Sequence, residues 1–566
     1  MATLREQLSE RLAAALAACG FPDAEAAVSP SSDERFGDYQ SNVAMVLGKR
    51  VRTNPRGLAE KILTELDVDG IAEPPEIAGA GFLNFRITEG VLVGFLEAMR
   101  SGERLGTSAV TPRTILLDFS SPNVAKPMHV GHIRSTILGD CLARVARFLG
   151  HHVITDNHIG DWGTQFGKVI HGWKHLLDEE ALTKNPIAEM ARLYREVNAR
   201  EAANPAVAKT VREELVKLQS GDPENLAIWK RCVALSWTEF QKLYDLLDIR
   251  FDERLGESAY HEALAPLCRR LEETGLAEAS EGALCVFFRD IPELAERPAI
   301  VRKADGGFLY ATTDLATIEY RVARWNPDEV WYVVGAPQGL HFQQIFEVAR
   351  RMGVSANLRH IPFGSILGAD RKIMKTRSGE NIGLGEVLEE ALERAEKIVA
   401  EKNPSLESGE RTRIARMLGV GAVKYAELSQ HRMTDYVFSW DKMLAFQGNT
   451  APYLQNACVR IHSIFRKAGE ERPGQIALRT PPERALGIKL ARYPESLPLV
   501  LEDFRPNLLA NYLYELAEHF HAFYEACPVL KADPGERASR LALCELTVRV
   551  LTHGLGLLGI EVPERM

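Results

Sequence analysis

The sequence predicts an α/β protein: a doubly wound parallel sheet with insertions, a smaller α+β domain before it and an all-α helical bundle after it. Three observations support this. The 566 residues are too many for one hydrophobic core. Residues 113–156 read as strand, helix and strand. From residue 431 onward the apolar residues recur only at helical spacing.

The strand–helix–strand unit opens the sheet. Residues 113–119 are a short apolar run typical of a buried strand, residues 130–149 carry apolar side chains at helical spacing, and residues 152–156 read as the next strand. Pro122 and Pro127 keep the intervening loop non-helical. Free N–H groups at the start of such a helix suit a phosphate ligand.

The same pattern recurs later in the chain. Residues 330–350 read as a buried strand that runs into a helix, and residues 308–317 read as another. We therefore expect the sheet to resume near Phe308, after an insertion at about residues 170–300. This is a Rossmann-type arrangement, whose two halves meet over one crevice.

The first 105 residues read as the α+β domain. Thr3 and Glu6 form a capping box at the start of an amphipathic helix. A basic cluster follows, which is either a solvated loop or a phosphate-contacting patch. Its members are Lys49, Arg50, Arg52 and Arg56.

The last segment, residues 431–566, reads as the helical bundle. A core stripe is formed by Leu509, Leu513, Leu516, Phe520 and Phe523. A second group mixes polar, aromatic and basic side chains, as an RNA-reading surface does, although core packing with polar decoration fits as well. These residues are Asn449, Tyr453, Gln455 and Arg460.

Composition narrows the function classes. The net charge of −9 argues mildly against a nucleic-acid partner, but phosphate binding needs only a local basic patch. No apolar run is long enough for a membrane span, and the N-terminus is charged. The eight cysteines show no disulfide or zinc spacing. We expect a cytoplasmic protein with core thiols, no structural zinc and no membrane partner.

The turn before the first helix carries the chemistry. His129 and His132 lie three residues apart on one helical face and can donate to phosphate oxygens, while Gly131 lets a flat base approach the backbone. Two surface histidines are the ordinary alternative. A zinc site is less favoured because no third ligand stands at metal spacing.

A second basic segment follows the sheet. Its cations lie among glycines, which suits a mobile cover over a polyphosphate, and a plain surface loop is the alternative. They are Arg371, Lys372, Lys375 and Arg377.

Several motifs carry a family resemblance. The string HVGH at residues 129–132 resembles the HIGH signature of class I aminoacyl-tRNA synthetases. Eight segments, in order, resemble those of arginyl-tRNA synthetases: SSPNVAKPMHVGH, GDWGTQFG, LGES, LYATTDLA, GAPQGLHFQQ, MKTRSG, GNTAPYLQ and LLGIEVPERM. The resemblance implies a tRNA-contacting domain at 1–105, a catalytic domain at 106–430 and an anticodon-binding domain at 431–566.

The resemblance also implies the reaction. L-Arginine is activated with ATP, accompanied by Mg²⁺, to arginyl-adenylate and is then transferred to the terminal ribose hydroxyl of tRNA(Arg), with release of AMP and pyrophosphate. The implied catalytic residues are His129, His132, Lys126 and Lys375; the implied ATP-binding residues are His129, Gly131, His132, Lys372 and Lys375. The chain departs from the family's KMSK loop, because Ile373 stands where the first lysine is expected.

Arginine needs acceptors for its forked guanidinium. The resemblance assigns the guanidinium to Glu257, Tyr310 and Asp314, and the α-amino and carboxylate end to Asp118, Ser121, Asn123, His132 and Gln338. The expected tRNA contacts are Arg50, Arg52, Asn449, Tyr453, Gln455 and Arg460. Family members are often monomers, so a monomer is expected.

Two other functions fit parts of the pattern. A small nucleotidyltransferase also uses H-x-G-H, but the long helical tail and the basic N-terminal cluster count against it. A non-catalytic tRNA-binding protein derived from a synthetase is the third hypothesis, and the intact HVGH and YATTD motifs count against that.

Overall fold

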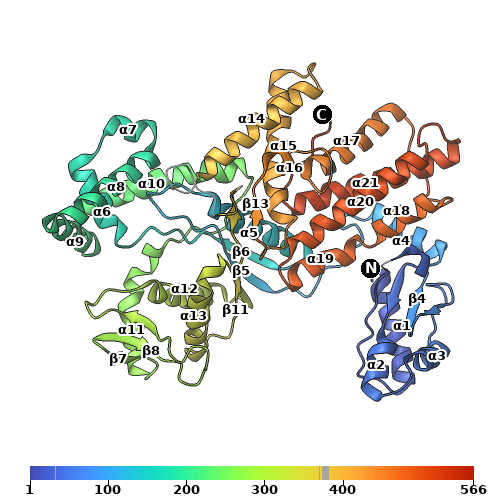
Figure 1. The fold of residues 1–566 in the computed structure, drawn as a ribbon, viewed down its shortest axis with the longest axis horizontal. Coiled ribbons are helices and arrows are strands. Elements are labelled where there is room, and N and C mark those ends of the chain that lie inside the picture. Colours follow the sequence, from blue (N-terminus) through green and yellow to red (C-terminus); the bar gives the residue numbers. More distant parts are fainter. Residues whose placement is uncertain (32, 369, 373–381) are drawn as a thin grey trace. The chain divides into compact units, whose positions relative to one another are not determined.

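The computed structural model describes residues 1–31, 33–368, 370–372 and 382–566 (Figure 1). The chain divides into two compact units. One unit contains residues 1–110 and 445–566, and the other contains residues 111–444.

A four-stranded parallel sheet organises the second unit, in the order β11-β10-β5-β6. Its strands are β5 (Thr114–Asp118), β6 (His152–Asp156), β10 (Glu329–Val333) and β11 (Asn357–Ile361). The chain passes from β5 to β6 through α5 (Val130–Leu149), and from β10 to β11, in the opposite direction, through α13 (Gly339–Arg351). The switch point of the sheet therefore lies between β5 and β10, and the predicted doubly wound fold is confirmed.

The prediction that this sheet resumes near Phe308 is wrong. Phe308 forms only an isolated bridge with Arg302, and α12 (Tyr310–Trp325) begins two residues later. The preceding apolar segments form a separate antiparallel sheet of β7 (Glu278–Ser280), β8 (Ala283–Val286) and β9 (Ala299–Arg302). A run interrupted by Gly306 and Gly307 is too short for a central strand, so the sheet resumes at β10.

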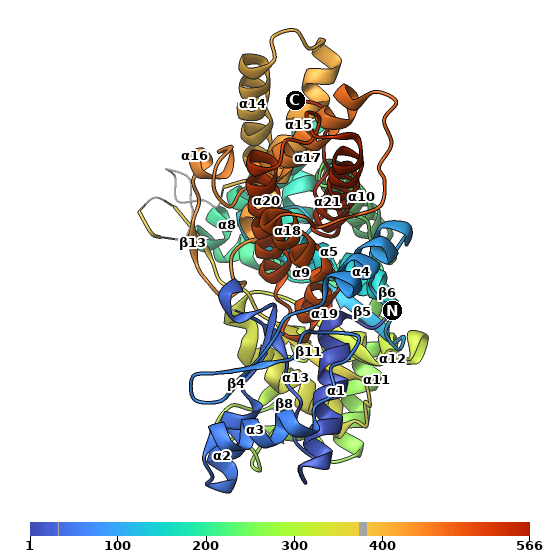
Figure 2. The same ribbon diagram turned by 90° about the vertical axis from the view of Figure 1, so that its right-hand side faces the viewer.

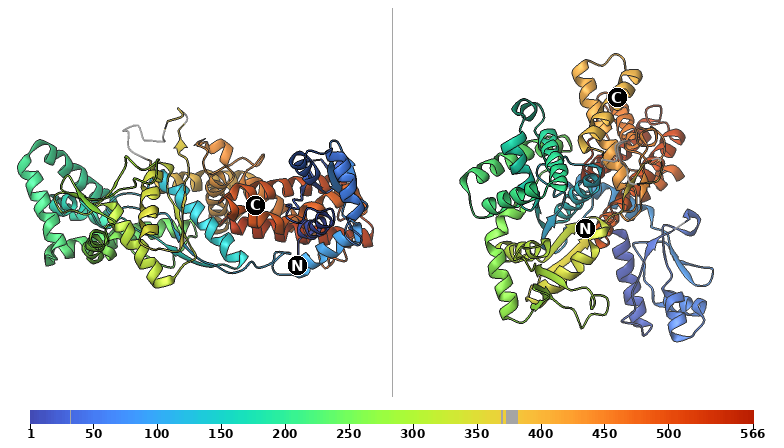
Figure 3. Two further views of the ribbon diagram at one scale, coloured as in Figure 1. Left: turned by 90° about the horizontal axis from the view of Figure 1, so that it is seen from below. Right: turned by 60° about the vertical axis from the view of Figure 1, so that its left-hand side comes forward.

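A group of helices forms the insertion before this small sheet and is drawn in teal in the left-hand view of Figure 3. Asparagines cap two of them: the side chains of Asn185 and Asn204 each accept a backbone N–H of the first turn. Each asparagine also precedes a proline at the first helical position. The group consists of α6 (Gln165–Leu176), α7 (Glu179–Lys184), α8 (Pro186–Ala203), α9 (Pro205–Gln219) and α10 (Pro223–Leu246). The 3₁₀ turn η2 (Glu257–Tyr260) and α11 (His261–Glu273) follow.

The rest of this unit consists of helices and one pair of short strands. The helices α14 (Leu384–Lys402) and α15 (Ser408–Leu428) pack on each other and on α5. The short strands β12 (Ile366–Leu367) and β13 (Tyr436–Val437) pair in parallel. The 3₁₀ turn η3 (Ala336–Gln338) precedes α13, and α16 (Trp440–Met443) follows β13.

The N-terminal part of the first unit is α+β, as predicted. Its antiparallel sheet has the order β1-β2-β4-β3, and the capping box of Thr3 and Glu6 begins α1. Its elements are α1 (Leu4–Ala18), β1 (Ser29–Pro30), η1 (Glu34–Phe36), β2 (Tyr39–Ser41), α2 (Val43–Val51), α3 (Pro55–Glu65), β3 (Glu76–Ala78), β4 (Phe82–Phe85) and α4 (Glu89–Ser101).

The C-terminal part of the same unit is the predicted helical bundle, and Figure 2 shows α18, α20 and α21 side by side in red. All five residues of the expected core stripe, Leu509 to Phe523, are buried on α20. The helices are α17 (Ala451–Ala468), α18 (Pro481–Ala491), α19 (Tyr493–Glu502), α20 (Pro506–Ala526) and α21 (Pro534–Leu557).

The cysteines lie in the interior of the protein. All eight cysteines are buried free thiols, as the sequence predicts. Among the described residues, no helix combines the length and the apolar character that a membrane crossing requires.

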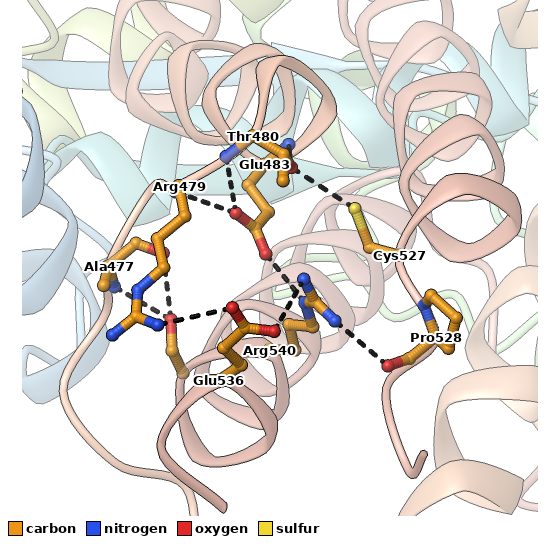
Figure 4. Close-up of polar contacts among 9 residues, drawn as sticks. Ala477, Arg479, Thr480, Glu483, Cys527, Pro528, Glu536 and Arg540 are labelled. Carbon is orange, nitrogen blue, oxygen red and sulfur yellow. Dashed lines mark hydrogen bonds and ion pairs between the residues drawn. The ribbon is translucent and has the colours of Figure 1, made fainter. Parts of the chain in front are cut away.

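A buried ion pair joins two helices of the bundle (Figure 4). Arg540 of α21 donates through Nε to Glu483 of α18 at 2.7 Å, and 8% and 2% of the two side chains are exposed. The same carboxylate accepts from the backbone N–H groups of Arg479 and Thr480, both at 2.8 Å. Glu483 thus caps α18 and anchors it to α21.

Replacing Arg540 with methionine should destabilise the bundle by about 3–5 kcal/mol, because it leaves Glu483 buried without its cation. Urea denaturation followed by far-ultraviolet circular dichroism measures the change. The matched control is Arg479→Met, which removes the 59% exposed partner of Glu536 and should cost less than about 1 kcal/mol. Equal midpoints for the two variants would contradict this account.

Candidate active site

A cavity of about 420 Å³ lies at the switch point of the parallel sheet. It is bounded by the loop after β5, the first turns of α5, the end of β10 with the following turn, and residues 363–366. Five of the residues predicted from the sequence line it: Ser121, His129, Gly131, His132 and Gln338. Ligands of doubly wound sheets bind at this position.

The two histidines form a reciprocal cap at the start of α5. The backbone N–H of Gly131 donates to His129 Nδ1 at 3.1 Å, and the backbone N–H of His129 donates to His132 Nδ1 at 3.0 Å. A nitrogen that accepts an N–H carries no proton, so each ring has its proton on Nε2. Both imidazoles therefore offer an Nε2–H donor beside a helix N-terminus.

Both rings are also kept neutral. Burial lowers the pKa of His132 to about 3, and the neighbouring His129 adds to the effect. Burial and the Lys126 ammonium lower the pKa of His129. The pair therefore stabilises negative charge through hydrogen bonds and the helix dipole rather than as imidazolium ions.

Gly131 also makes room for the helix cap. A Cβ at this position would lie 2.8 Å from Cε1 of His129, so the glycine makes room for the His129 ring.

The loop before α5 is strained. Ser120, Ser121 and Ala125 have φ values of 73°, 45° and 61°, in the left-handed region. Each conformation is stabilised by a hydrogen bond to a side chain that was not among the predicted site residues. The N–H groups of these three residues donate to Ser135 Oγ at 2.9 Å, Asn157 Oδ1 at 3.2 Å and Ser236 Oγ at 3.0 Å.

The predicted guanidinium ligands interact with one another. Tyr310 and Asp314 occupy the first turns of α12, which begins at Tyr310, so they share a face as expected. Burial, together with the charges of Asp314 and Asp161, raises the pKa of Glu257 to about 8. A cation placed beside Glu257 would favour its ionised form.

His341 belongs to this acidic group, although the sequence analysis did not select it. Its Nε2 lies 2.5 Å from Asp314 Oδ2, and about a quarter of each side chain is exposed. His341 stands on α13, three residues after Gln338, so it connects the acidic group with the cavity wall. The GLHFQQ motif contained it, but no spacing rule marked it.

Asp118 is not an open carboxylate. Its Oδ1 accepts from Ser121 Oγ at 2.9 Å, and its Oδ2 lies 2.7 Å from Nη2 of the fully buried Arg321. The same Nη2 lies 2.8 Å from Asp156 Oδ2. Asp118 and Asp156 therefore share one guanidinium nitrogen.

The remaining candidates of this unit are more exposed. Lys126 is half-buried, with Nζ 5.2 Å from the centre of the Tyr194 ring. Asn123 and Lys372 are exposed. Lys375 and the whole Ile373–Thr376 motif lie outside the described residues.

The described part of the chain holds no cluster of three or more side chains suited to a metal ion. The lining of the cavity contains no carboxylate. It therefore does not fit a magnesium ion coordinated by the protein, because Mg²⁺ prefers carboxylate and phosphate oxygens.

The residues expected to contact tRNA differ in their exposure to solvent. Arg50 and Arg52 are exposed at the end of α2, and Asn449 is exposed before α17. Tyr453 and Arg460 both contact His521 on α20. The expectation that Gln455 belongs to an RNA-reading surface is wrong. This side chain is fully buried, and it donates to the Glu561 carbonyl at 2.7 Å.

A parallel sheet whose first crossover helix begins with paired histidines, beside a separate acidic group, defines a class I aminoacyl-tRNA synthetase. Family models agree: "tRNA synthetases class I (R), catalytic domain" matches residues 96–440, "DALR anticodon binding domain" 454–566 and "Arginyl tRNA synthetase N terminal domain" 3–87.

Curated relatives named arginine–tRNA ligase match over the full length of both chains, with 44% identity for those of Cellvibrio japonicus and Thermobifida fusca. The solved arginyl-tRNA synthetase of Plasmodium falciparum has 30% identity and a TM-score of 0.86, with full coverage of both chains. That of Thermus thermophilus has 26% identity and a TM-score of 0.85, covering 99% of this chain and 100% of its own. The chain belongs to the arginyl-tRNA synthetase family.

The raised pKa of Glu257 predicts that guanidinium binding at this acidic group depends on pH. With a pKa of about 8, this carboxyl is mostly protonated at pH 7, and an adjacent guanidinium favours its ionised form. Binding should therefore release a proton below pH 8, so arginine affinity should rise from pH 6.5 to 8, by at most about tenfold per unit, and then level off. Calorimetry in buffers of different ionisation heat measures the proton released.

The control is Glu257→Gln, which keeps the size of the side chain but does not titrate. Its arginine affinity should be weaker and should lose the part of the pH dependence that Glu257 contributes. An unchanged proton release in this variant would show that another group titrates.

Proposed function

We propose that this chain is an arginine–tRNA ligase: it activates L-arginine with ATP to arginyl-adenylate and transfers arginine to the terminal ribose hydroxyl of tRNA(Arg), releasing AMP and pyrophosphate. One observation carries the proposal: the second unit contains both features that the reaction needs. His129 and His132 are neutral imidazole donors on the cavity, and Glu257 lies close to the carboxylates of Asp314 and Asp161, which raise its pKa. The first feature suits a reacting phosphate and the second a permanent cation.

In the first step the carboxylate of arginine attacks the α-phosphorus of ATP, and the bond to the pyrophosphate oxygen breaks. The attacking group is already ionised, so the step needs no general base. Negative charge grows on the phosphoryl oxygens, where His129 and His132 donate through Nε2–H. Lys126 adds a positive charge three residues before His129.

In the second step the ribose hydroxyl of tRNA attacks the carbonyl carbon of the adenylate, and AMP leaves. The role of the protein is to orient the arginyl group, since the adenylate already has a good leaving group. The guanidinium is bound by Glu257, Tyr310 and Asp314. The α-amino and carboxylate end is bound by Asp118, Ser121, Asn123, His132 and Gln338.

Magnesium accompanies ATP in this proposal. Because the cavity lining contains no carboxylate, the phosphates and water coordinate the ion rather than a side chain of the described residues. His129, Gly131, His132 and Lys372 bind the nucleotide, and Lys375 keeps its sequence-based assignment.

The acidic group also provides selectivity. A lysine side chain has a single ammonium, and citrulline has no charge, so either leaves a buried carboxylate with an unmade hydrogen bond. This discrimination needs no editing domain.

We assign tRNA contacts to both parts of the first unit. The matched anticodon-binding domain, residues 454–566, contains Arg460 and supports a role for it. Asn449 and Tyr453 lie just before the matched range and keep their sequence-based assignment, and the exposed Arg50 and Arg52 suit phosphates. We propose a domain division at 1–105, 106–430 and 431–566. A monomeric state and a cytoplasmic location stay predictions.

Attachment of labelled arginine to bulk tRNA tests the function and the site together. Asp314→Ala should raise the KM for arginine at least about tenfold, because a charged hydrogen bond contributes about 1.5–3 kcal/mol. His132→Ala should lower kcat by about a hundredfold to a thousandfold, since its donor acts on charge that develops in the transition state.

Each variant has a matched control. Glu319→Ala removes an acid from the same helix as Asp314, but one that pairs with Arg270 on the surface, and His152→Ala removes an exposed histidine of β6. Both controls should keep wild-type kinetics. Equal activity of all five proteins would refute the site, and wild-type protein that attaches no arginine would refute the function.

A further inference from the structure

A short segment after β6, residues 159–161, has no part in the mechanism above, and it contacts the loop after β5. The N–H of Gly160 donates to the Pro122 carbonyl, and the N–H of Val124 donates to the Gly160 carbonyl, both at 3.0 Å. Asn123, which is assigned to the α-amino and carboxylate end of arginine, forms an isolated parallel bridge with Gly160. A Cβ at Gly160 would lie 2.2 Å from Asn123 Oδ1, so only a glycine lets the two segments lie this close.

The same segment contacts the turn that carries Glu257. The N–H of Glu257 donates to the Ile159 carbonyl at 3.1 Å. The carboxylate of Asp161 accepts twice from the next residue of the turn, from the N–H of Ser258 at 2.8 Å and from its Oγ at 2.7 Å. A Cβ at Gly256 would lie 2.4 Å from Asp161 Cγ, so this glycine leaves room for the carboxylate. Glu257 is thus held through its own N–H and through its neighbour.

The segment is itself well fixed. Asp161 is 5% exposed, and its N–H donates to the Ile159 carbonyl at 2.9 Å. Its carbonyl accepts from Trp229 Nε1 of α10 at 2.7 Å. The ring of Trp162 packs against Trp229 and His261, with centroids 5.6 Å and 5.0 Å apart. A carboxylate supported in this way can hold a ligand residue in one position.

Electrostatics also place Asp161 beside Glu257. The charges of Asp314 and Asp161 add to burial in raising the pKa of Glu257, and the backbone N–H of Trp162 opposes this rise. Burial raises the pKa of Asp161, and its hydrogen bonds from Ser258 act in the opposite direction. Further titratable groups around the pair are His158, His261, Tyr310 and His341.

One rigid segment therefore contacts both ends of the predicted arginine site. A site measures the length of a flexible side chain only when the groups that bind its two ends are held at a fixed distance. In such a site, one methylene too many or too few changes the specificity by about 10-fold to 200-fold.

We propose that residues 159–161 set the distance between the two ends of the arginine site, with Asp161 as the positioning residue that holds Glu257 through Ser258. The proposal rests on the function proposed above, since it takes L-arginine as the ligand. Asp161 acts through Glu257 and does not touch the substrate.

The test compares arginine with homoarginine, which is one methylene longer, in the attachment assay with the full-length protein. The readout is the ratio of the inhibition constant of homoarginine to the KM for arginine, which should exceed about 10 in the wild type. Asp161→Ala should raise the KM for arginine and lower this ratio at least about fivefold, because a loosened Glu257 can follow a longer side chain. The KM for ATP should stay within about twofold.

Asp161→Asn separates position from charge. Its amide oxygen can accept the N–H of Ser258 and its amide nitrogen can donate to Ser258 Oγ, so the homoarginine ratio should stay within about twofold of the wild type. The pKa of Glu257 falls when the neighbouring negative charge is removed, so the rise of arginine affinity with pH should move to lower pH.

A double variant tests whether Asp161 acts through Glu257. With no carboxylate left to position, Asp161→Ala in a Glu257→Ala background should change the KM for arginine by less than about twofold. The matched control is Asp178→Ala, which also removes a carboxylate that accepts two N–H groups, both at 3.0 Å, at the start of α7. This control should keep the wild-type KM and homoarginine ratio.

Three results would overturn the proposal: a wild-type ratio near one, a ratio unchanged in Asp161→Ala, or the same rise in KM with and without Glu257. Should Asp161→Ala fail to fold, Ser258→Ala removes one of the two hydrogen bonds, and an unchanged ratio in that variant would overturn the proposal equally. Wild-type protein that attaches no arginine would instead refute the proposed function.

Discussion

The site depends on the way α5 begins. The first turn of a helix has N–H groups without helical partners, and here two of them, at His129 and Gly131, donate to histidine side chains. This single arrangement caps the helix, fixes the tautomer of each ring and turns each Nε2–H outward. A lysine in the same place would supply charge but no fixed direction. The neutral rings supply direction, and the helix dipole supplies the field.

The inserted helices contribute to this arrangement from a distance in sequence. Tyr244 of α10 exchanges a hydrogen bond of 2.8 Å with Ser120 Oγ and accepts one of 3.0 Å from Asn157, and Ser236 of the same helix satisfies Ala125. These contacts hold the strained loop between β5 and α5. The insertion therefore supports this loop, and its removal would take away the bond that satisfies Ala125 and the contacts of Tyr244 with Ser120 and Asn157.

Local patterns predicted much of this structure from the sequence. The βαβ unit, the capping box at Thr3 and the core stripe on α20 depend on residues close together in the chain, and all three are confirmed. The resumption of the sheet at Phe308 was wrong because strand pairing is decided by distant partners. His341 and Ser236 were missed for the same reason: their contacts with Asp314 and Ala125 are not revealed by any spacing in the sequence.

The charges of the second unit are arranged so that a substrate completes them. Arg321 neutralises only one of the two carboxylates that it contacts, and Glu257 keeps a proton near neutral pH because Asp314 and Asp161 lie close by. One acidic group lies beside the loop after β5 and the other on the first turns of α12, and a cation placed at either would favour its ionised carboxylates. L-Arginine carries two cations, an ammonium and a guanidinium, separated by a flexible chain. A ligand with only one of them would leave one acidic group uncompensated in a partly buried site, where an unpaired charge is costly. Recognition of both ends thus follows from electrostatics as well as from shape.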